Sequence, residues 1–299
     1  MKLLICDPIS EKAIEEIKAL GIEVTNKPDI TPEELLEEIG NYDGIIVRSR
    51  TKVRQNVIDR GENLKFIIRG GVGLDNIDVE YANSKGIKVL NTPAASSISV
   101  AELAIGFMFA LSRHIVQGTT SMRNGEWLKK KLKGSELYGK TLGIIGIGRI
   151  GREVARRAIA LGMKVISYDP YVDKIDMEGV ELVDLDTLLS NSDFITLHIP
   201  HTDETHHIIG KDAFEKMKDG VYLINCARGG VVDEEALYEY MKSGKVKGAG
   251  FDVFEKEPPE NLKLLELENF ICTPHIGAST KEGQARVGEE IVKILKGMI

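Results

Sequence analysis

One segment, residues 141–170, limits the fold of this chain more than any other. It reads TLGIIGIGRIGREVARRAIALGMKVISYDP: an apolar strand, the glycines Gly146, Gly148 and Gly151, an alanine-rich helix, and a second strand ending at Asp169, 18 residues after Gly151. The first glycine permits a tight turn, the second lets the backbone approach a pyrophosphate, and the third lets helix and strand pack closely. The N–H groups and positive dipole end at the helix start favour an anion. The segment therefore predicts a dinucleotide site in a β-α-β unit.

Asp169 indicates which dinucleotide binds. A carboxylate at this strand end accepts hydrogen bonds from the adenosine ribose hydroxyls and repels a 2′-phosphate, so we predict NAD as the cofactor rather than NADP. A second glycine-rich turn, RGGVG at 69–73, also follows a strand, but its helix lacks a third glycine in register. That turn is better suited to hold a substrate anion on its N–H groups.

Strand-like and helical segments alternate along the rest of the chain. Val/Ile-rich runs such as KLLIC, GIIVRS and KFIIR precede amphipathic stretches, and TPEELLEEIG has a capping-box pattern at Thr31, Pro32 and Glu34. A second β-α series follows the hinge-like NTPAASS (91–97) and one long helix expected from about Ser97 to Asn124. Because 299 residues are many for one core, the pattern predicts an α/β protein with two doubly wound parallel-sheet domains.

Composition narrows the functional class. The formal net charge of -7 argues against a nucleic-acid partner. Three scattered cysteines argue against a disulfide framework and favour a cytoplasmic location. The N-terminus is too soon interrupted by Asp7 and Pro8 to read as a signal peptide, and the apolar stretch 100–116 contains Glu102, Arg113 and His114. That stretch reads as a core helix, so we expect a soluble protein with no membrane partner.

A nicotinamide cofactor requires a group that binds the substrate carboxylate or carbonyl and an acid/base that moves the hydroxyl proton. Three strand ends carry such groups: Arg228 in VYLINCARGG, Glu257 in GFDVFEKEPP and His275 in FICTPHIGAS. Alone, His275 reads as a turn histidine and Arg228 as a salt-bridge residue, and Glu255 and Glu260 rival Glu257. The four histidines in HIPHTDETHHIIG (198–210) lack helical i, i+4 spacing and a cysteine partner, so a loop is favoured over a metal site.

Seven motifs in one order resemble the D-isomer-specific 2-hydroxyacid dehydrogenase family over nearly the whole chain. They are VRSRTK, GVGLDNIDVEYA, GIKVLNTP, GKTLGIIGIGRIGREVA, INCARGGVVDEEAL, DVFEKEPP and PHIGASTKEGQ. The likeness is strongest to members that oxidise D-3-phosphoglycerate to 3-phosphohydroxypyruvate, the first step of serine biosynthesis. It implies an NAD-dependent oxidoreductase in which Arg228 binds the substrate, His275 is the general acid/base and Glu257 is the partner of His275.

The same resemblance implies a domain plan and a set of cofactor contacts. A flavodoxin-like substrate domain would comprise residues 1–96 and 276–299, with a Rossmann NAD-binding domain, 97–275, inserted into it. The long helix near 97–124 would form a homodimer. The residues expected at the cofactor are Val72, Gly146, Gly148, Arg149, Ile150, Gly151, Asp169, Ile199, Cys226, Ala227, Arg228, Asp252, His275, Gly277 and Ala278.

The candidate activities differ in whether the substrate carries a phosphate at the end remote from its carboxylate. We predict a phosphorylated 2-hydroxy acid, D-3-phosphoglycerate, with Arg48, Arg50 and Arg69 around the phosphate; the substrate residues would be Arg48, Ser49, Arg50, Arg69, Gly70, Gly71, Arg228 and His275. The alternative is a basic cleft for hydroxypyruvate, glyoxylate or another small 2-keto acid. A more remote alternative is an NAD-sensing corepressor built on the same fold. The chain stops after one helix, so we expect no serine feedback through a C-terminal regulatory domain of the ACT type.

Overall fold

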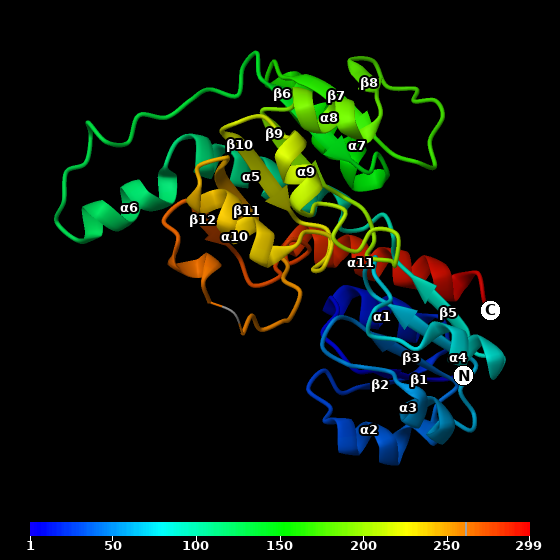
Figure 1. Cartoon of the computed structure of the whole chain (residues 1–299). Coiled ribbons are helices and arrows are strands. Elements are labelled where there is room, and N and C mark those ends of the chain that lie inside the picture. Colours follow the sequence, from blue (N-terminus) through cyan, green and yellow to red (C-terminus); the bar gives the residue numbers. More distant parts are fainter. Residues whose placement is uncertain (261) are drawn as a thin grey trace. The chain divides into compact units, whose positions relative to one another are not determined.

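Two parallel sheets organise the chain, which the computed structural model describes over residues 1–260 and 262–299 (Figure 1). Met1–Ser99 and Ala278–Ile299 form one compact unit, called here the terminal unit, and Val100–Gly277 form a second, the central unit. The divisions fall three and two residues beyond the expected boundaries at 96/97 and 275/276. The predicted fold class, two doubly wound α/β domains with one inserted into the other, is confirmed.

The terminal unit contains a five-stranded parallel sheet in the order β2-β1-β3-β4-β5, the flavodoxin-like order. Its elements are β1 (Lys2–Ile5), α1 (Glu11–Ala19), β2 (Glu23–Asn26), α2 (Pro32–Glu38), η1 (Ile39–Asn41), β3 (Gly44–Val47), α3 (Gln55–Arg60), β4 (Phe66–Arg69), α4 (Val79–Ser84), β5 (Lys88–Asn91) and α11 (Lys281–Lys296).

Helices cover both faces of this sheet because its strands are apolar on both sides. Ile45 and Ile67 point into a core with α2, α3 and α4, whereas Ile46 and Ile68 point into a core with α1 and α11. The C-terminal helix α11 thus completes the unit that the N-terminus begins. The predicted capping box at the start of α2 is confirmed, with the Thr31 hydroxyl and the Glu34 carboxylate each accepting a backbone N–H.

The central unit contains a seven-stranded parallel sheet in the order β12-β11-β10-β9-β6-β7-β8, a Rossmann arrangement that reverses direction beside β6. Its elements are α5 (Ser97–Ser112, which begins in the terminal unit), α6 (Ile115–Arg123), β6 (Thr141–Ile145), α7 (Arg149–Ala160), β7 (Lys164–Tyr168), β8 (Val180–Leu182), α8 (Leu185–Asn191), β9 (Phe194–Leu197), α9 (Lys211–Lys216), β10 (Val221–Asn225), α10 (Glu234–Lys242), β11 (Val246–Phe251), η2 (Leu264–Glu266) and β12 (Phe270–Cys272).

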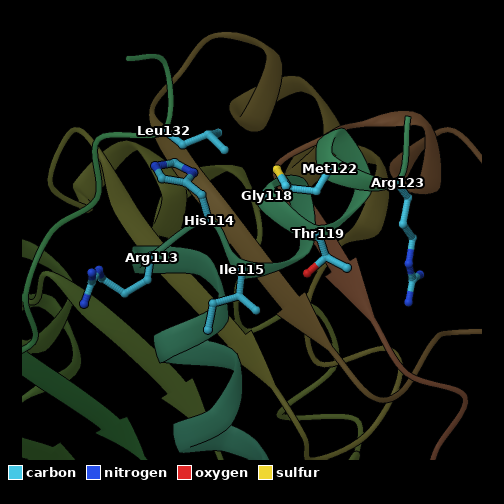
Figure 2. Close-up of a pocket in the computed structure, with 8 residues that line it drawn as sticks. All are labelled: Arg113, His114, Ile115, Gly118, Thr119, Met122, Arg123 and Leu132. Carbon is cyan, nitrogen blue, oxygen red and sulfur yellow. The ribbon is translucent and has the colours of Figure 1, made fainter. Parts of the chain in front are cut away.

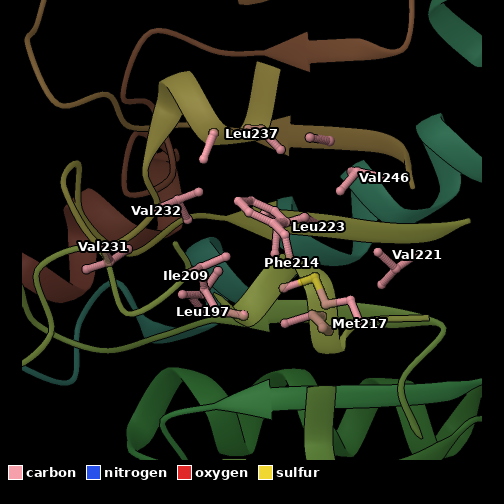
Figure 3. Packing of buried hydrophobic residues seen from close by; sticks show 14 of the residues in the cluster. Leu197, Ile209, Phe214, Met217, Val221, Leu223, Val231, Val232, Leu237 and Val246 are labelled. Atoms are coloured by element: carbon pink, nitrogen blue, oxygen red, sulfur yellow. The ribbon is translucent and has the colours of Figure 1, made fainter. Parts of the chain in front are cut away.

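Two cores flank this sheet as well. Figure 3 shows the core under α9 and α10, where Phe214 and Met217 pack against Leu223 and Leu237. On the other face, α5 and α7 pack against Ile144 and Ile224. Residues 100–112 of the apolar stretch expected to be a core helix therefore lie in one, and residues 113–116 lie beyond its end.

The expectation of a single helix from Ser97 to Asn124 is wrong at one point. The helix stops at Ser112 and restarts at Ile115, and the two parts are bent by 61°. His114 at the break has a left-handed backbone (φ +54°), and its Nδ1 lies 3.1 Å from Oε1 of Gln117. No glycine or proline marks the break. Among the described residues no single helix could span a membrane; α5 and α6 pass that test of length and composition only as a bent pair.

Candidate active site

The carboxyl ends of the seven parallel strands meet along one edge of the central sheet, and the predicted site residues of this unit follow several of those ends. Gly146 follows β6, Asp169 follows β7, Arg228 is three residues beyond β10, and His275 is three residues beyond β12. β6 lies between β7 and β9, so the glycine loop sits where the strand order reverses. Ligands of open α/β sheets bind in the crevice at such a point.

The glycine loop has the shape that a dinucleotide pyrophosphate requires. Gly146 has φ +92°, and a Cβ there would lie 2.7 Å from the carbonyl oxygen of His198. A Cβ on Gly151 would lie 2.2 Å from the carbonyl oxygen of Gly146, whereas Gly148, the N-cap of α7, faces open space. Two glycines are therefore required by close packing, and the third leaves room at the helix N-terminus, where Arg149 and Ile150 begin α7.

Asp169 is attached to this loop. Its Oδ2 accepts a hydrogen bond from the backbone N–H of Ile147 at 3.0 Å, and its Oδ1 accepts one from Tyr171 at 3.1 Å. Each carboxylate oxygen keeps accepting capacity for a ribose hydroxyl. The residues of the glycine loop and of β7 thus fit an adenosine dinucleotide without a 2′-phosphate.

His275 and Glu257 form a hydrogen-bonded pair. The Nδ1 of His275 lies 2.7 Å from Oε2 of Glu257, and the other oxygen of Glu257 accepts the backbone N–H of Phe254 at 3.2 Å. His275 has a left-handed backbone (φ +53°), and its side chain is 44% exposed. Because Nδ1 is engaged, Nε2 is the ring nitrogen left to exchange a proton with a substrate.

The pair perturbs the pKa of both partners. The hydrogen bond to Glu257 raises the pKa of His275, against burial and the charge of Arg228, which lower it. Burial raises the pKa of Glu257, but the net pKa is lowered, because the hydrogen bond and charge of His275 and the hydrogen bond from the Phe254 N–H act against burial. The charge of Arg228 adds to that lowering. The three side chains therefore interact with one another electrostatically.

The Arg228 loop is held by two residues that sequence reasoning did not select. The buried Asn225 donates from Nδ2 to the backbone oxygen of Arg228 at 2.9 Å and accepts the N–H of Ala227 at 3.0 Å. A Cβ on Gly229 would lie 1.8 Å from the backbone oxygen of Phe254, so only glycine lets this loop approach the segment before Glu257. The amide that ends the otherwise apolar VYLIN was the available signal for Asn225.

Asp252 fixes the loop that presents His275. Its buried carboxylate accepts hydrogen bonds from the Thr273 hydroxyl (2.5 Å) and from the N–H groups of Ile276 (2.8 Å) and Gly277 (2.7 Å). Burial, together with the charge of Asp252, raises the pKa of the Cys226 thiol well above its usual range. Cys226 is therefore a neutral neighbour of the site and not a nucleophile.

The three glutamates of the acidic loop after β11, which sequence alone did not distinguish, have different partners. Glu257 bonds His275, Glu255 bonds His207 at 2.9 Å, and Glu260 forms an ion pair with Lys256. Among the described residues no group of three His, Cys, Asp or Glu side chains is placed to hold a metal. Ile199 lies two residues beyond β9 in the same unit, and Val72 and Ala278 belong to the terminal unit, so their cofactor contacts stay predictions.

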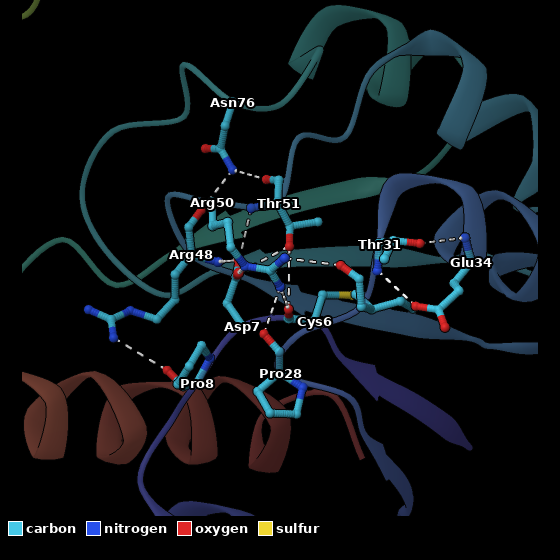
Figure 4. A network of polar contacts seen from close by, with 11 residues as sticks. Cys6, Asp7, Pro8, Pro28, Thr31, Glu34, Arg48, Arg50, Thr51 and Asn76 are labelled. Carbon is cyan, nitrogen blue, oxygen red and sulfur yellow. Dashed lines mark hydrogen bonds and ion pairs between the residues drawn. The ribbon is translucent and has the colours of Figure 1, made fainter. Parts of the chain in front are cut away.

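In the terminal unit, Figure 4 shows a polar network at the carboxyl ends of β1 and β3, where that sheet reverses its order. The Asp7 carboxylate accepts the N–H of Arg48 (2.5 Å) and Nε of Arg50 (3.1 Å). The guanidinium of Arg50 also donates to the backbone oxygens of Ile30 (3.0 Å), Cys6 (2.6 Å) and Pro28 (2.6 Å).

This network involves one of the predicted phosphate ligands. Four of the five N–H groups of the Arg50 guanidinium are engaged within the unit, so Arg50 connects three loops, and its contact with a phosphate stays a prediction. Arg48 differs, because its Nε is buried with no hydrogen-bond partner among the described residues and its Nη1 reaches only Pro8, at 3.3 Å.

Arg69, the third predicted phosphate ligand, is positioned by the glycine turn. Its Nη2 donates to Ser49 Oγ at 3.1 Å, and a Cβ on Gly71 would lie 1.4 Å from its Nη1. Gly71, with φ +150°, therefore lets the Arg69 guanidinium lie against its backbone.

Residues 105–277 match the family described as "D-isomer specific 2-hydroxyacid dehydrogenase, NAD binding domain". The chain belongs to this family. The match includes the glycine loop, Arg228, Glu257 and His275, and NAD is the cofactor of this domain.

Several relatives match over nearly the whole chain. A hydroxypyruvate reductase of Thermotoga maritima is 56% identical over 97% of this chain and 96% of its own length. A D-3-phosphoglycerate dehydrogenase of Methanocaldococcus jannaschii is 53% identical over 99% of this chain, which spans 58% of that protein. A crystal structure of a D-lactate dehydrogenase from Aquifex aeolicus, complexed with NAD and lactic acid, has 35% identity and a TM-score of 0.84 and covers 100% of this chain and 95% of its own.

Proposed function

We propose that this chain catalyses the NAD-dependent oxidation of D-3-phosphoglycerate to 3-phosphohydroxypyruvate, the first step of serine biosynthesis. The observation that carries the proposal is the His275–Glu257 hydrogen bond of 2.7 Å, with the charge of Arg228 acting on both side chains, in the unit that binds NAD. Bound NAD supplies the hydride acceptor. The chain supplies the proton acceptor and the carboxylate ligand.

In this mechanism Arg228 binds the carboxylate of the 2-hydroxy acid, which a guanidinium can do through two parallel hydrogen bonds at any working pH. Nε2 of His275 removes the proton of the C2 hydroxyl as the hydride leaves C2. Glu257 keeps the ring oriented through Nδ1 and stabilises the imidazolium that results. In the reverse direction His275 donates the same proton to the carbonyl oxygen.

The phosphate is assigned to Arg48 and Arg69. Burial lowers the pKa of Arg48, opposed by the charge of Asp7, which indicates a cation with little water around it. Such a cation gains more from an anion than an exposed arginine does. Ser49, Gly70 and Gly71 form the adjoining backbone, where a Cβ on Gly70 would lie 3.2 Å from Cγ of Arg48.

Arg48→Gln is expected to raise KM for D-3-phosphoglycerate by about 10- to 100-fold, the equivalent of one or two charge-assisted hydrogen bonds. The KM for D-glycerate, which has no phosphate, should stay within a factor of about three. Arg60→Gln, an equal change of charge at the end of α3, is the matched control. Steady-state NADH formation with both acids checks the prediction. Equal losses for both acids would remove the phosphate assignment.

The second candidate is a hydroxypyruvate or glyoxylate reductase, and the 56% identical hydroxypyruvate reductase favours it. The two candidates differ in the ratio of kcat/KM for 3-phosphohydroxypyruvate and hydroxypyruvate with NADH. A ratio well above one supports the phosphorylated substrate, whereas a ratio near or below one supports the reductase. No turnover of any 2-hydroxy or 2-keto acid, together with tight NADH binding, would instead favour a sensor protein.

We also propose that α6 and the segment after it form a homodimer contact with a second copy of the chain. Ile115, Val116 and Met122 on α6 are about half exposed, and Trp127 is 75% exposed. A pocket of about 620 Å³ on this face has Ile115, Met122 and Leu132 among its lining residues. Figure 2 shows these side chains. Apolar patches of this kind mark interaction surfaces.

Light scattering is expected to give twice the chain mass of 33.0 kDa for the wild type and the monomer mass for the Ile115→Glu/Met122→Glu double variant. A circular dichroism spectrum identical to that of the wild type would show that the variant is folded. A wild-type monomer at micromolar concentration would contradict the dimer.

A further inference from the structure

Three histidines of the loop after β9 form a chain of ring contacts. Nε2 of His201 lies 3.0 Å from Nδ1 of His206, and the ring of His206 stacks on that of His207 with a centroid distance of 3.9 Å. Nε2 of His207 lies 2.9 Å from Oε1 of Glu255, in the loop after β11. These residues are called here the histidine cluster. It has no part in the mechanism described above.

The histidine cluster lies against the loop that carries Arg228. The N–H of His207 donates to the backbone oxygen of Gly230 at 2.8 Å, and that of Ile209 donates to Val231 at 3.1 Å. The position of a Cβ on Gly230 would be 2.8–3.2 Å from three ring atoms of His201, so this imidazole packs directly on the Gly230 backbone. Ile209 and Val231 are both buried in the core that Figure 3 shows.

Glu255 ties the cluster to a third loop. Its backbone N–H donates to Oε1 of Glu234 at 2.7 Å, and its carboxylate faces His207. Glu257, the partner of His275, is two residues further along. The cluster therefore connects the loops after β9, β10 and β11, two of which contain predicted catalytic side chains.

Carboxylates gather at the His207 end of the cluster. Glu255, Asp233 (4.0 Å from Nδ1 of His207) and Glu234 face His207. Glu204 accepts a hydrogen bond from the Thr202 hydroxyl. The bond between His201 and His206 needs one ring nitrogen to donate and the other to accept.

We propose that the histidine cluster positions the Arg228 loop for substrate binding through the ring of His201, which packs on the Gly230 backbone two residues from Arg228. The inference rests on the proposed role of Arg228. His206, hydrogen-bonded to His201 and stacked on His207, holds the His201 ring in place. Asn225 anchors the backbone oxygen of Arg228 itself, and the His201 ring adds a second contact further along the same loop.

The test is the KM for hydroxypyruvate with NADH at pH 7, with kcat measured alongside. His206→Gln keeps a hydrogen-bonding partner for His201, so its KM should stay within about threefold of the wild-type value. His206→Ala removes that partner and should raise KM about as much as His201→Ala does. His114→Gln, the same change as His206→Gln but outside the cluster, should behave as the wild type does.

His201→Ala removes the ring from Gly230 and is expected to raise KM at pH 7 about fivefold, roughly the effect of one lost packing or hydrogen-bond contact, with kcat nearly unchanged. The dissociation constant of NADH, measured by fluorescence, should stay within a factor of two in all variants, whereas general unfolding would weaken it. An unchanged KM in His201→Ala, or a KM in His206→Gln as high as that in His201→Ala, would overturn the inference.

The proposed function fails in a different way. If Arg228→Lys leaves KM unaltered, Arg228 does not bind the substrate, and both the proposed function and this inference fall. If Arg228→Lys raises KM while the histidine variants leave KM unchanged, only the positioning role of the histidine cluster is contradicted.

Discussion

Replacing His275 by alanine is expected to lower kcat for NADH formation by about 10²- to 10⁴-fold, the range for loss of a general acid/base. The hydrogen bond to Glu257 leaves Nε2 as the nitrogen that can take the C2 hydroxyl proton. NAD binding should be retained, because the glycine loop and Asp169 supply the pyrophosphate and ribose contacts. Steady-state kinetics check the loss of kcat, and an NADH fluorescence titration checks that cofactor binding is retained. A variant that keeps more than about a tenth of the wild-type kcat would exclude His275 as the base.

The matched variant is Glu257→Gln, which keeps a hydrogen-bonding side chain and removes the charge. In the wild type the pKa of His275 is raised, chiefly by this hydrogen bond. Oxidation needs the neutral ring, so its rate should rise with pH through that raised pKa, and reduction, which needs the imidazolium, should fall over the same interval. Glu257→Gln should move both transitions to lower pH. A pH profile that does not move would contradict the pairing.

Replacing Arg228 by glutamine is expected to raise KM for the 2-hydroxy acid by about 10²- to 10³-fold, the loss of a bidentate charged contact. Arg228→Lys keeps the charge without the planar fork and should be intermediate. The loop itself should persist, because Asn225 binds the backbone oxygen of Arg228 and not its side chain. The measurement is KM and kcat for both variants, with thermal melting to exclude unfolding.

An effect on NAD affinity equal to the effect on KM would contradict this assignment, since Arg228 is proposed to act on the substrate. Lys and Gln variants with the same KM would show that charge and geometry at Arg228 do not matter.

Much of the site was predictable because strand ends and glycines are local signals. The cofactor loop was predicted from the sequence GIGRIG between two apolar runs and from Asp169 after the second run. His275 and Arg228 followed from the rule that parallel strands end at one edge. The choice of Glu257 over Glu255 needed the family pattern, because spacing alone does not say which carboxylate turns toward which histidine. In the structure each glutamate has its own histidine partner.

The remaining features depend on contacts that single-sequence patterns do not encode. Arg50 resembles Arg48 in VRSRTK, yet its donors are taken by backbone oxygens of Cys6, Pro28 and Ile30, which are brought together by folding. The helix break at His114 has no proline or glycine to mark it, and it depends on a left-handed histidine. Gly229 is one of two adjacent glycines. It is distinguished by its close approach to Phe254, where an added Cβ would lie 1.8 Å from the backbone oxygen.

The way Asp252 holds the segment after β12 has a practical consequence for redesign of substrate preference. Two of its three hydrogen bonds are accepted from backbone N–H groups, those of positions 276 and 277, which every amino acid except proline provides. The side chain of Ile276 is 42% exposed and has no share in this anchoring. Libraries that vary position 276 can therefore sample new side chains beside His275 while the neighbouring imidazole keeps its anchored loop.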